Sequence, residues 1–205
     1  MIKRIMMMAT ILAGWALWPM YGYAKTGVDC AKVTDAGERL LCYDAVFKSE
    51  TVTKNNSASN WAIVIDKSKI DDSQTVVLGS DSDEEFDDKF SLKKINATLL
   101  LRCFEGKTSI LIGAGNHFLA DIQSFGKVTI RLDSGAPFTQ GFTSTTDHKW
   151  LGLFGGTAVP LIKKIMAANV IVLRFTPFNG APMVATFQVA GLQNDIAPLR
   201  QACRW

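Results

Sequence analysis

The 205-residue sequence has few of the side chains that most often carry chemistry: it contains two histidines, His117 and His148, and four cysteines. It has no Cys-x-x-Cys pair and no group of residues with zinc-ligand spacing, so it gives little support to a metal centre or a thiol redox site. The Gly-x-Ser-x-Gly nucleophile elbow of many hydrolases is also missing. The formal net charge of +3 gives no electrostatic basis for nucleic-acid binding. We therefore expect no catalytic residues, no metal, no cofactor and no nucleic-acid partner.

The N-terminus has the composition of an export signal. Two basic residues precede an uncharged stretch, residues 5–24, which contains Pro19 and ends in small residues. This pattern predicts a signal peptide over residues 1–24, with cleavage after Ala24. The alternative is an uncleaved anchor, because about 20 apolar residues can span a bilayer. We expect membrane contact only through this segment, if it is retained. Its removal takes away two basic residues and no acidic ones, which lowers the formal charge from +3 to +1.

All four cysteines follow the signal: Cys30, Cys42, Cys103 and Cys203. An even number of cysteines in an exported protein indicates two disulfides, which four cysteines can form in three ways. We favour Cys30 with Cys42 and Cys103 with Cys203. Asp35 and Glu38 have the spacing of a capping box, so we expect a helix to begin there and Cys30 to lie in a preceding turn that folds back. Residues 25–50 are therefore predicted to be a short helical segment clipped by a disulfide.

The rest of the chain has the pattern of a β-rich domain, residues 61–205, after a polar linker, residues 51–60. Hairpins are predicted where apolar runs flank turn residues, at 97–113 around Gly106 and at 170–189 around Asn179-Gly180. Further strands are expected at 61–66, 75–79, 127–133 and 150–154. Helices are expected at 157–169 and at the C-terminus, where apolar residues recur at helical spacing up to Cys203. The predicted fold is α+β: a mostly antiparallel β-sandwich or open barrel with these two helices.

Two acidic clusters have alternative interpretations. Asp71 and Asp72 could form a metal or acid pair, but aspartates in a turn commonly accept hydrogen bonds from their own backbone. The run 81–88 holds six carboxylates, and its interpretations are a calcium site, a solvated loop or a docking strip for a basic partner. Because the run lacks the glycine and glutamate positions of an EF-hand loop, calcium is the less favoured of these.

One loop contains the residue types of a hydrolase triad: Ser144, Asp147 and His148. A triad is assembled by folding from separate segments, whereas these three residues lie within one short stretch. We therefore do not expect serine hydrolysis.

An ordered set of short segments runs through the chain after the signal. The segments are Cys30 with Arg39-Leu40-Leu41-Cys42-Tyr43-Asp44, Trp61, 68–73, Leu101-Arg102-Cys103, Arg131-Leu132-Asp133, 144–147, 187–192 and Cys203-Arg204-Trp205. In this order they resemble the VasI family, also called TagO, of type VI secretion-associated proteins. The resemblance implies an accessory periplasmic protein of a contractile injection apparatus in Gram-negative bacteria, without known enzymatic activity. Its partners would be envelope or secretion-apparatus proteins, among them the membrane complex, or peptidoglycan. The chain departs from the family in its acidic run, 81–88, and in a glycine-rich stretch, 152–156.

The expected function is therefore that of a non-enzymatic periplasmic accessory protein of a type VI secretion system. The alternatives are an exported prophage exclusion factor or envelope inhibitor and, less favoured, an envelope hydrolase that uses His148 or the Asp71 and Asp72 pair. A candidate interaction patch consists of polar residues on otherwise apolar strands: Arg102, Arg131 and Asp133. The alternative for this patch is a salt bridge on the outer face of the sheet, which contributes little to stability when exposed.

Overall fold

The computed structural model describes residues 27–47 and 59–205. The predicted signal peptide, its cleavage after Ala24 and most of the predicted linker lie outside the described residues. The described residues form two compact units, residues 27–47 and residues 59–205. Within the described ranges, no helix combines the length and the apolar composition that crossing a membrane requires.

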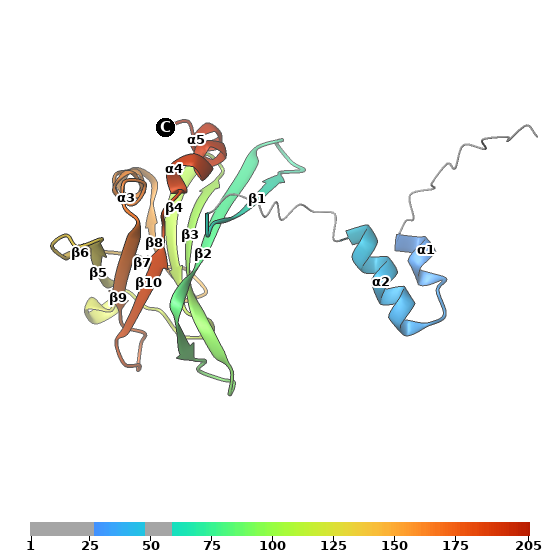
Figure 1. The fold of residues 1–205 in the computed structure, drawn as a ribbon, viewed down its shortest axis with the longest axis horizontal. Helices are drawn as coiled ribbons and strands as arrows, with labels where there is room; N and C mark the ends of the chain where they lie inside the picture. The colour runs from blue at the N-terminus through green and yellow to red at the C-terminus, as the bar shows by residue number, and fades with distance from the viewer. Residues whose placement is uncertain (1–26, 48–58) are drawn as a thin grey trace, which may run out of the picture. The chain divides into compact units, whose positions relative to one another are not determined.

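The N-terminal unit is a pair of helices, α1 (Gly27–Ala31) and α2 (Ala36–Phe47), held by a disulfide (Figure 1). Asp35 Oδ1 accepts the backbone N–H of Glu38 at 2.9 Å, so Asp35 begins α2 as its spacing predicts. The Cys30–Cys42 bond joins the two helices, with a Cα–Cα distance of 5.4 Å. Cys30 lies in the short helix α1 rather than in the expected turn, because the reversal comes after it, at residues 32–35.

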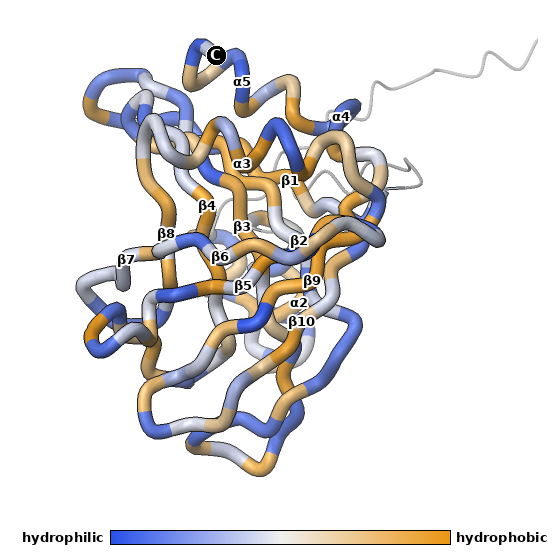
Figure 2. The backbone as a smooth tube through the Cα atoms, turned by 90° about the vertical axis from the view of Figure 1, so that its left-hand side faces the viewer, coloured by the Kyte–Doolittle hydropathy of each residue, from blue (hydrophilic) through white to orange (hydrophobic). Residues whose placement is uncertain are grey.

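The larger unit is a sandwich of two antiparallel sheets (Figure 1). The six-stranded sheet has the order β1 (Ala62–Lys67), β2 (Gln74–Asp87), β3 (Lys94–Phe104), β4 (Lys107–Gly113), β8 (Trp150–Phe154) and β7 (Thr143–Ser144). The four-stranded sheet has the order β10 (Met183–Gln188), β9 (Val170–Phe175), β5 (Lys127–Leu132) and β6 (Phe138–Gly141). This confirms the predicted α+β fold, as a sandwich rather than a closed barrel. Figure 2 shows the hydrophobic residues concentrated along the strands.

The predicted hairpin at 97–113 is the centre of the six-stranded sheet. Its turn, Glu105-Gly106, has φ values of 48° and 69°, the left-handed backbone that a two-residue hairpin turn requires. Leu99 is paired with Ile112 and Leu101 with Ile110, and all four side chains are almost fully buried in the core between the sheets. A one-residue slip would turn these side chains to the other face, so their burial fixes the register.

Short helices lie at the end of the sandwich that carries the C-terminus (Figure 1). They are α3 (Ala158–Ile165), preceded by η2 (Gly155–Thr157), and the C-terminal pair α4 (Leu192–Asp195) and α5 (Ala197–Cys203). A separate short helix, η1 (Ile122–Ser124), precedes β5. The predicted helix at 157–169 is shorter than expected, and the predicted C-terminal helix is two helices that meet at Ile196. Pro198, in the first turn of α5, lacks the N–H that a continuous helix would need there.

Candidate functional site: the outward face of the six-stranded sheet

The six-stranded sheet presents an apolar face to the outside as well as to the core. On β3, alternate residues from Ala97 to Cys103 are buried in the core, so the residues between them point outward. The strand register places outward residues of neighbouring strands beside one another. We call this surface the Arg102 face and define it by these residues: Val64, Val77, Leu100, Arg102, Leu111, Trp150 and Phe154. An exposed side of an antiparallel sheet is normally polar, so an apolar outward side is typical of an interaction surface.

Glycines let the aromatic rings of the Arg102 face pack directly on the sheet. A Cβ atom at Gly113 would lie 2.5 Å from the Trp150 ring, and one at Gly152 would lie 2.5 Å from the Phe154 ring. Because these rings cover their neighbours, outward-facing Leu111 is only 4% exposed. The sheet backbone and the rings therefore form one closely packed layer.

Arg102 places a cation within this apolar surface. Its Cζ atom lies 5.4 Å from the centroid of the Phe104 ring, a cation–π contact. Its Nε atom is buried and has no hydrogen-bond partner, and no carboxylate within the described part of the chain forms an ion pair with it. A buried polar group without a partner is costly. Arg102 as a whole is only half-buried, so the accessible part of its guanidinium can pair with a carboxylate supplied by another molecule.

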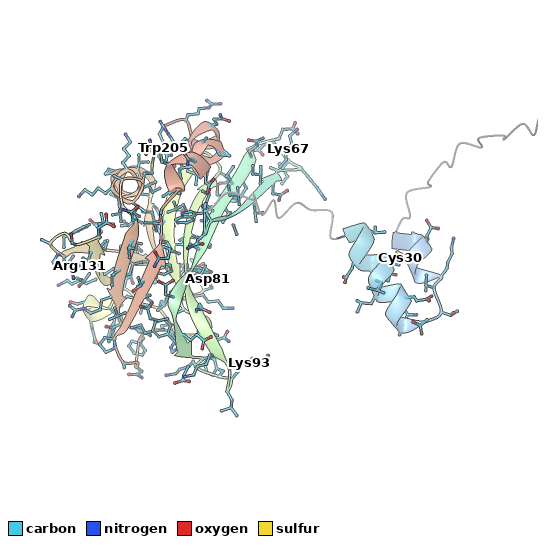
Figure 3. The ribbon with its side chains drawn as sticks, in the orientation of Figure 1. Cys30, Lys67, Asp81, Lys93, Arg131 and Trp205 are labelled. Atoms are coloured by element: carbon cyan, nitrogen blue, oxygen red, sulfur yellow. A yellow bond between two sulfur atoms is a disulfide. The ribbon has the colours of Figure 1, made fainter. Side chains whose placement is uncertain are left out.

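The structure does not bring the three residues of the predicted patch together. Arg102 points outward from the six-stranded sheet, whereas exposed Arg131 points outward from β5 of the four-stranded sheet (Figure 3). Asp133 follows β5 at a φ of 47°, and its Oδ1 accepts the backbone N–H groups of Asn169 and Val170 at 2.9 Å each. Asp133 thus has a structural task at the start of β9.

Asp71 and Asp72 lie in the turn between β1 and β2. The Asp71 carboxylate accepts the hydroxyl of Ser73 at 2.8 Å and its backbone N–H at 3.2 Å. Hydrogen bonding with Ser68 and with Ser73 lowers the pKa of Asp71. Asp72 forms an exposed ion pair with Lys67 at 2.7 Å. These contacts are those of a turn, and among the described residues no three His, Cys, Asp or Glu side chains converge on a metal position.

Most of the acidic run 81–88 forms a strand, not the solvated loop that was one of its three interpretations. Residues 81–87 continue β2 beyond its pairing with β1, with a register shift between Asp81 and Glu85. Glu84 accepts the backbone N–H and the hydroxyl of Thr186 in β10, each at 2.6 Å, and Asp83 accepts the side chain of Gln188 at 2.7 Å. Burial alone would raise the pKa of Glu84, but the two Thr186 hydrogen bonds outweigh it and the pKa is lowered.

These carboxylates have a clear structural role. β10 is an edge strand of the four-stranded sheet, and an edge strand has backbone groups without partners in its own sheet. Glu84 provides an acceptor for one of them and thereby ties the edges of the two sheets together.

The loop with the triad residue types has a different hydrogen-bond arrangement from a catalytic triad. His148 Nδ1 lies 3.3 Å from Ser144 Oγ, but the nearby carboxylate of Asp121 accepts from Ser144 at 3.4 Å and not from the imidazole. In a triad the carboxylate orients the imidazole, whose other nitrogen faces the serine. Asp147 accepts from the Thr145 hydroxyl, which lowers its pKa, and from the backbone N–H of Lys149. The His148 ring stacks on Phe118, with centroids 4.5 Å apart.

The C-terminal residues fasten the end of the chain to the sandwich. Cys203 is bonded to fully buried Cys103, with a Cα–Cα distance of 5.7 Å, so both disulfides of the favoured pairing are present. Trp205 Nε1 donates to Thr108 Oγ1 at 2.8 Å, and Arg200 Nε donates to the Trp205 main-chain oxygen at 3.2 Å. Shallow depressions of about 450 and 500 Å³ border α5, and both include Gln201 and Arg204.

The candidate residues predicted from the sequence include Arg102 but not the apolar residues around it. A signal for them exists in the uninterrupted runs Leu99-Leu100-Leu101 and Ile110-Leu111-Ile112. A strand with one polar face alternates, whereas these runs place apolar side chains on both faces.

Comparisons with known proteins identify the family. The family model described as type VI secretion system VasI, EvfG matches residues 29–205, which includes both disulfides and the Arg102 face. A search of curated proteins finds no match. Among solved structures, the chain is similar to the crystal structure of invasion associated protein B from Bartonella henselae, with 12% identity and a TM-score of 0.46, over 72% of this chain and 96% of that chain. On the family match, which confirms the resemblance noted in the sequence, the chain belongs to the VasI family of type VI secretion system proteins.

Proposed function

We propose that this protein is a non-enzymatic periplasmic accessory protein that supports type VI secretion by binding another protein of the apparatus through the Arg102 face. The observation that carries this proposal is an outward sheet face that combines apolar packing with a cation that forms no ion pair within the described residues. Membership of the VasI family supplies the biological system.

The composition of the face favours a protein partner. Aromatic residues and arginine are enriched at the energetically dominant positions of protein interfaces. Within the face, Phe154 and Val64 are each 43% exposed, and Phe104, which contacts Arg102 at the border of the face, is 45% exposed. Apolar area is therefore available to a partner. The partner would present a carboxylate beside apolar side chains, because that group pairs with Arg102 while the apolar groups cover its surroundings.

The two disulfides support a periplasmic location. Cys30–Cys42 and Cys103–Cys203 account for all four cysteines. Structural disulfides form and persist in oxidising compartments such as the bacterial periplasm and are rare in the cytosol.

Deletion of the gene in a strain that secretes actively tests this function. We expect release of the tube protein into the medium to fall sharply, and to recover when the wild-type gene is supplied in trans. The control is the amount of tube protein inside the cells, which should not change. Undiminished secretion by the deletion strain would contradict a supporting role in the apparatus.

A further inference from the structure

The loop between β2 and β3 displays two large apolar side chains in water. Phe90 is 81% exposed and Leu92 is 110% exposed, whereas most large apolar residues of this unit are buried. We call residues 89–94 the β2–β3 tip. Lys93 marks its position at the far end of the hairpin, away from Trp205 and the C-terminal helices (Figure 3).

The tip is held in shape by Asp88, the residue that follows β2. Asp88 is only 8% exposed, and its carboxylate accepts Ser91 Oγ at 2.7 Å and both the side-chain and backbone N–H groups of Asn116, at 3.2 and 3.3 Å. Its backbone N–H donates to the Lys93 carbonyl at 3.1 Å and closes the loop. The exposure of Phe90 and Leu92 is therefore built into a braced loop.

The charge that the tip presents outward is positive. Asp87 is paired with Lys94 at 2.6 Å, and the Asp88 carboxylate is turned inward toward Asn116. Lys89 reaches the main-chain oxygen of Asn179 at 3.4 Å. The Lys93 ammonium has no partner within the described residues. Both apolar side chains thus lie between lysines.

Apolar side chains flanked by lysines are typical of a surface that enters the interface of a membrane. The apolar groups lie at the boundary of headgroups and acyl chains, while lysine ammonium groups remain among the phosphates. Anionic phospholipids add electrostatic attraction for each lysine close to the surface. The neighbouring loop contributes a further aromatic ring, since Phe118 is 47% exposed and the adjacent His117 ring bonds the Asp87 carbonyl at 2.9 Å.

We propose that the β2–β3 tip binds the surface of a membrane that contains anionic phospholipids, with Phe90 and Leu92 inserted and Lys89 and Lys93 at the headgroups. This contact is additional to any made by the N-terminal segment, which is the one membrane contact predicted from the sequence. It does not depend on the Arg102 face, so the two proposals stand or fall separately.

Vesicle co-sedimentation of the protein purified from the periplasm of expressing cells tests the proposal. The probes are vesicles of phosphatidylethanolamine with phosphatidylglycerol and vesicles of phosphatidylcholine alone. We expect binding to the anionic vesicles that weakens with added salt. In the Phe90→Ser, Leu92→Ser double variant, partitioning should fall at least about tenfold, because both inserted groups are lost.

A matched control is available at the other exposed hairpin turn of the same sheet. Ile70 is 97% exposed and lies near Lys67 and Lys69, so Ile70→Ser removes a comparable side chain elsewhere and should leave binding unchanged. Lys93→Glu should weaken binding to the anionic vesicles only. The proposal is overturned if the wild-type protein does not prefer anionic vesicles, which is the result expected of a tip that binds a protein instead. It is also overturned if Ile70→Ser weakens binding as much as the double variant does. Lys93→Glu also serves as the second variant should the double variant fail to fold.

Discussion

Breaking the Cys103–Cys203 disulfide should destabilise the large unit strongly. The bond joins residues 100 positions apart and holds α5 against β3. In the chain-entropy model, a closed loop of about 100 residues contributes about 4.7 kcal/mol to the free energy of unfolding. With a typical unfolding entropy of about 2.1 cal/mol/K per residue, this loss lowers the Tm of a unit of this size by roughly 15 °C.

Thermal unfolding of three variants, followed by near-ultraviolet circular dichroism, measures this effect. Cys103→Ser and Cys203→Ser remove the same bond, so each should lower the Tm by a similar amount and the double variant by little more. The Cys30→Ser, Cys42→Ser double variant is the control, because that bond lies within the N-terminal unit and its loss should leave the main transition in place. Additive losses from Cys103→Ser and Cys203→Ser, or an unchanged Tm in either, would refute the reasoning.

Two further substitutions test local features of the fold. Gly113→Ala should lower the free energy of unfolding in urea by about 1–3 kcal/mol, because the added Cβ must displace the Trp150 ring from the sheet. Gly141→Ala, where an added Cβ meets nothing within 4 Å, is the control and should be neutral or slightly stabilising. Equal losses at both sites would count against the packing described. Asp88→Asn tests the brace of the β2–β3 tip. Hydrogen bonding, first of all from Ser91, holds the pKa of Asp88 at about 2, below its ordinary 3.8. The carboxylate therefore stabilises the fold above about pH 4, and this is lost as the pH falls through 2. The Tm difference between wild type and variant should shrink over that range, and a constant difference would contradict the assignment.

Local sequence determines the hairpins of this protein. Glu105-Gly106 adopts the two-residue turn predicted for it, and apolar residues on both sides specify the strands. The hairpin predicted around Asn179-Gly180 also forms, but through a longer connection, residues 176–182, in which Asn179 and not Gly180 has a positive φ. The Cys30–Cys42 pairing also followed from a local pattern, since the helix that begins at Asp35 allows the chain before it to fold back, although Cys30 itself lies in α1.

The role of the acidic run depends on residues far away in the sequence. Read alone, six carboxylates in eight residues have the composition of a solvated loop. Glu84 instead bonds Thr186, which lies 102 positions along the chain. No pattern in the residues around Glu84 indicates that the edge strand β10, with a backbone N–H unpaired in its own sheet, would lie beside this carboxylate.

The Arg102 face likewise depends on strand register. Trp150 covers Gly113 only because β4 and β8 pair at those two positions, although the loop between the strands is long. The sequence showed polar Arg102 on an apolar strand, but which strands surround it is a property of the assembled sheet. The same holds for Arg131, whose side chain the sheet order places on the outward face of the other sheet.

The central claim, that the Arg102 face binds another protein of the secretion apparatus, is tested most directly by tube-protein secretion in the deletion strain complemented with face variants. Arg102→Glu reverses a charge that forms no ion pair within the described residues, and Val64→Glu places a charge on the apolar part of the face. Val184→Glu is the matched control: Val184 is 46% exposed, against 43% for Val64, and points outward from the four-stranded sheet. At equal periplasmic protein levels, we predict that Arg102→Glu and Val64→Glu fail to restore secretion while Val184→Glu restores it; full secretion with the two face variants would contradict the account.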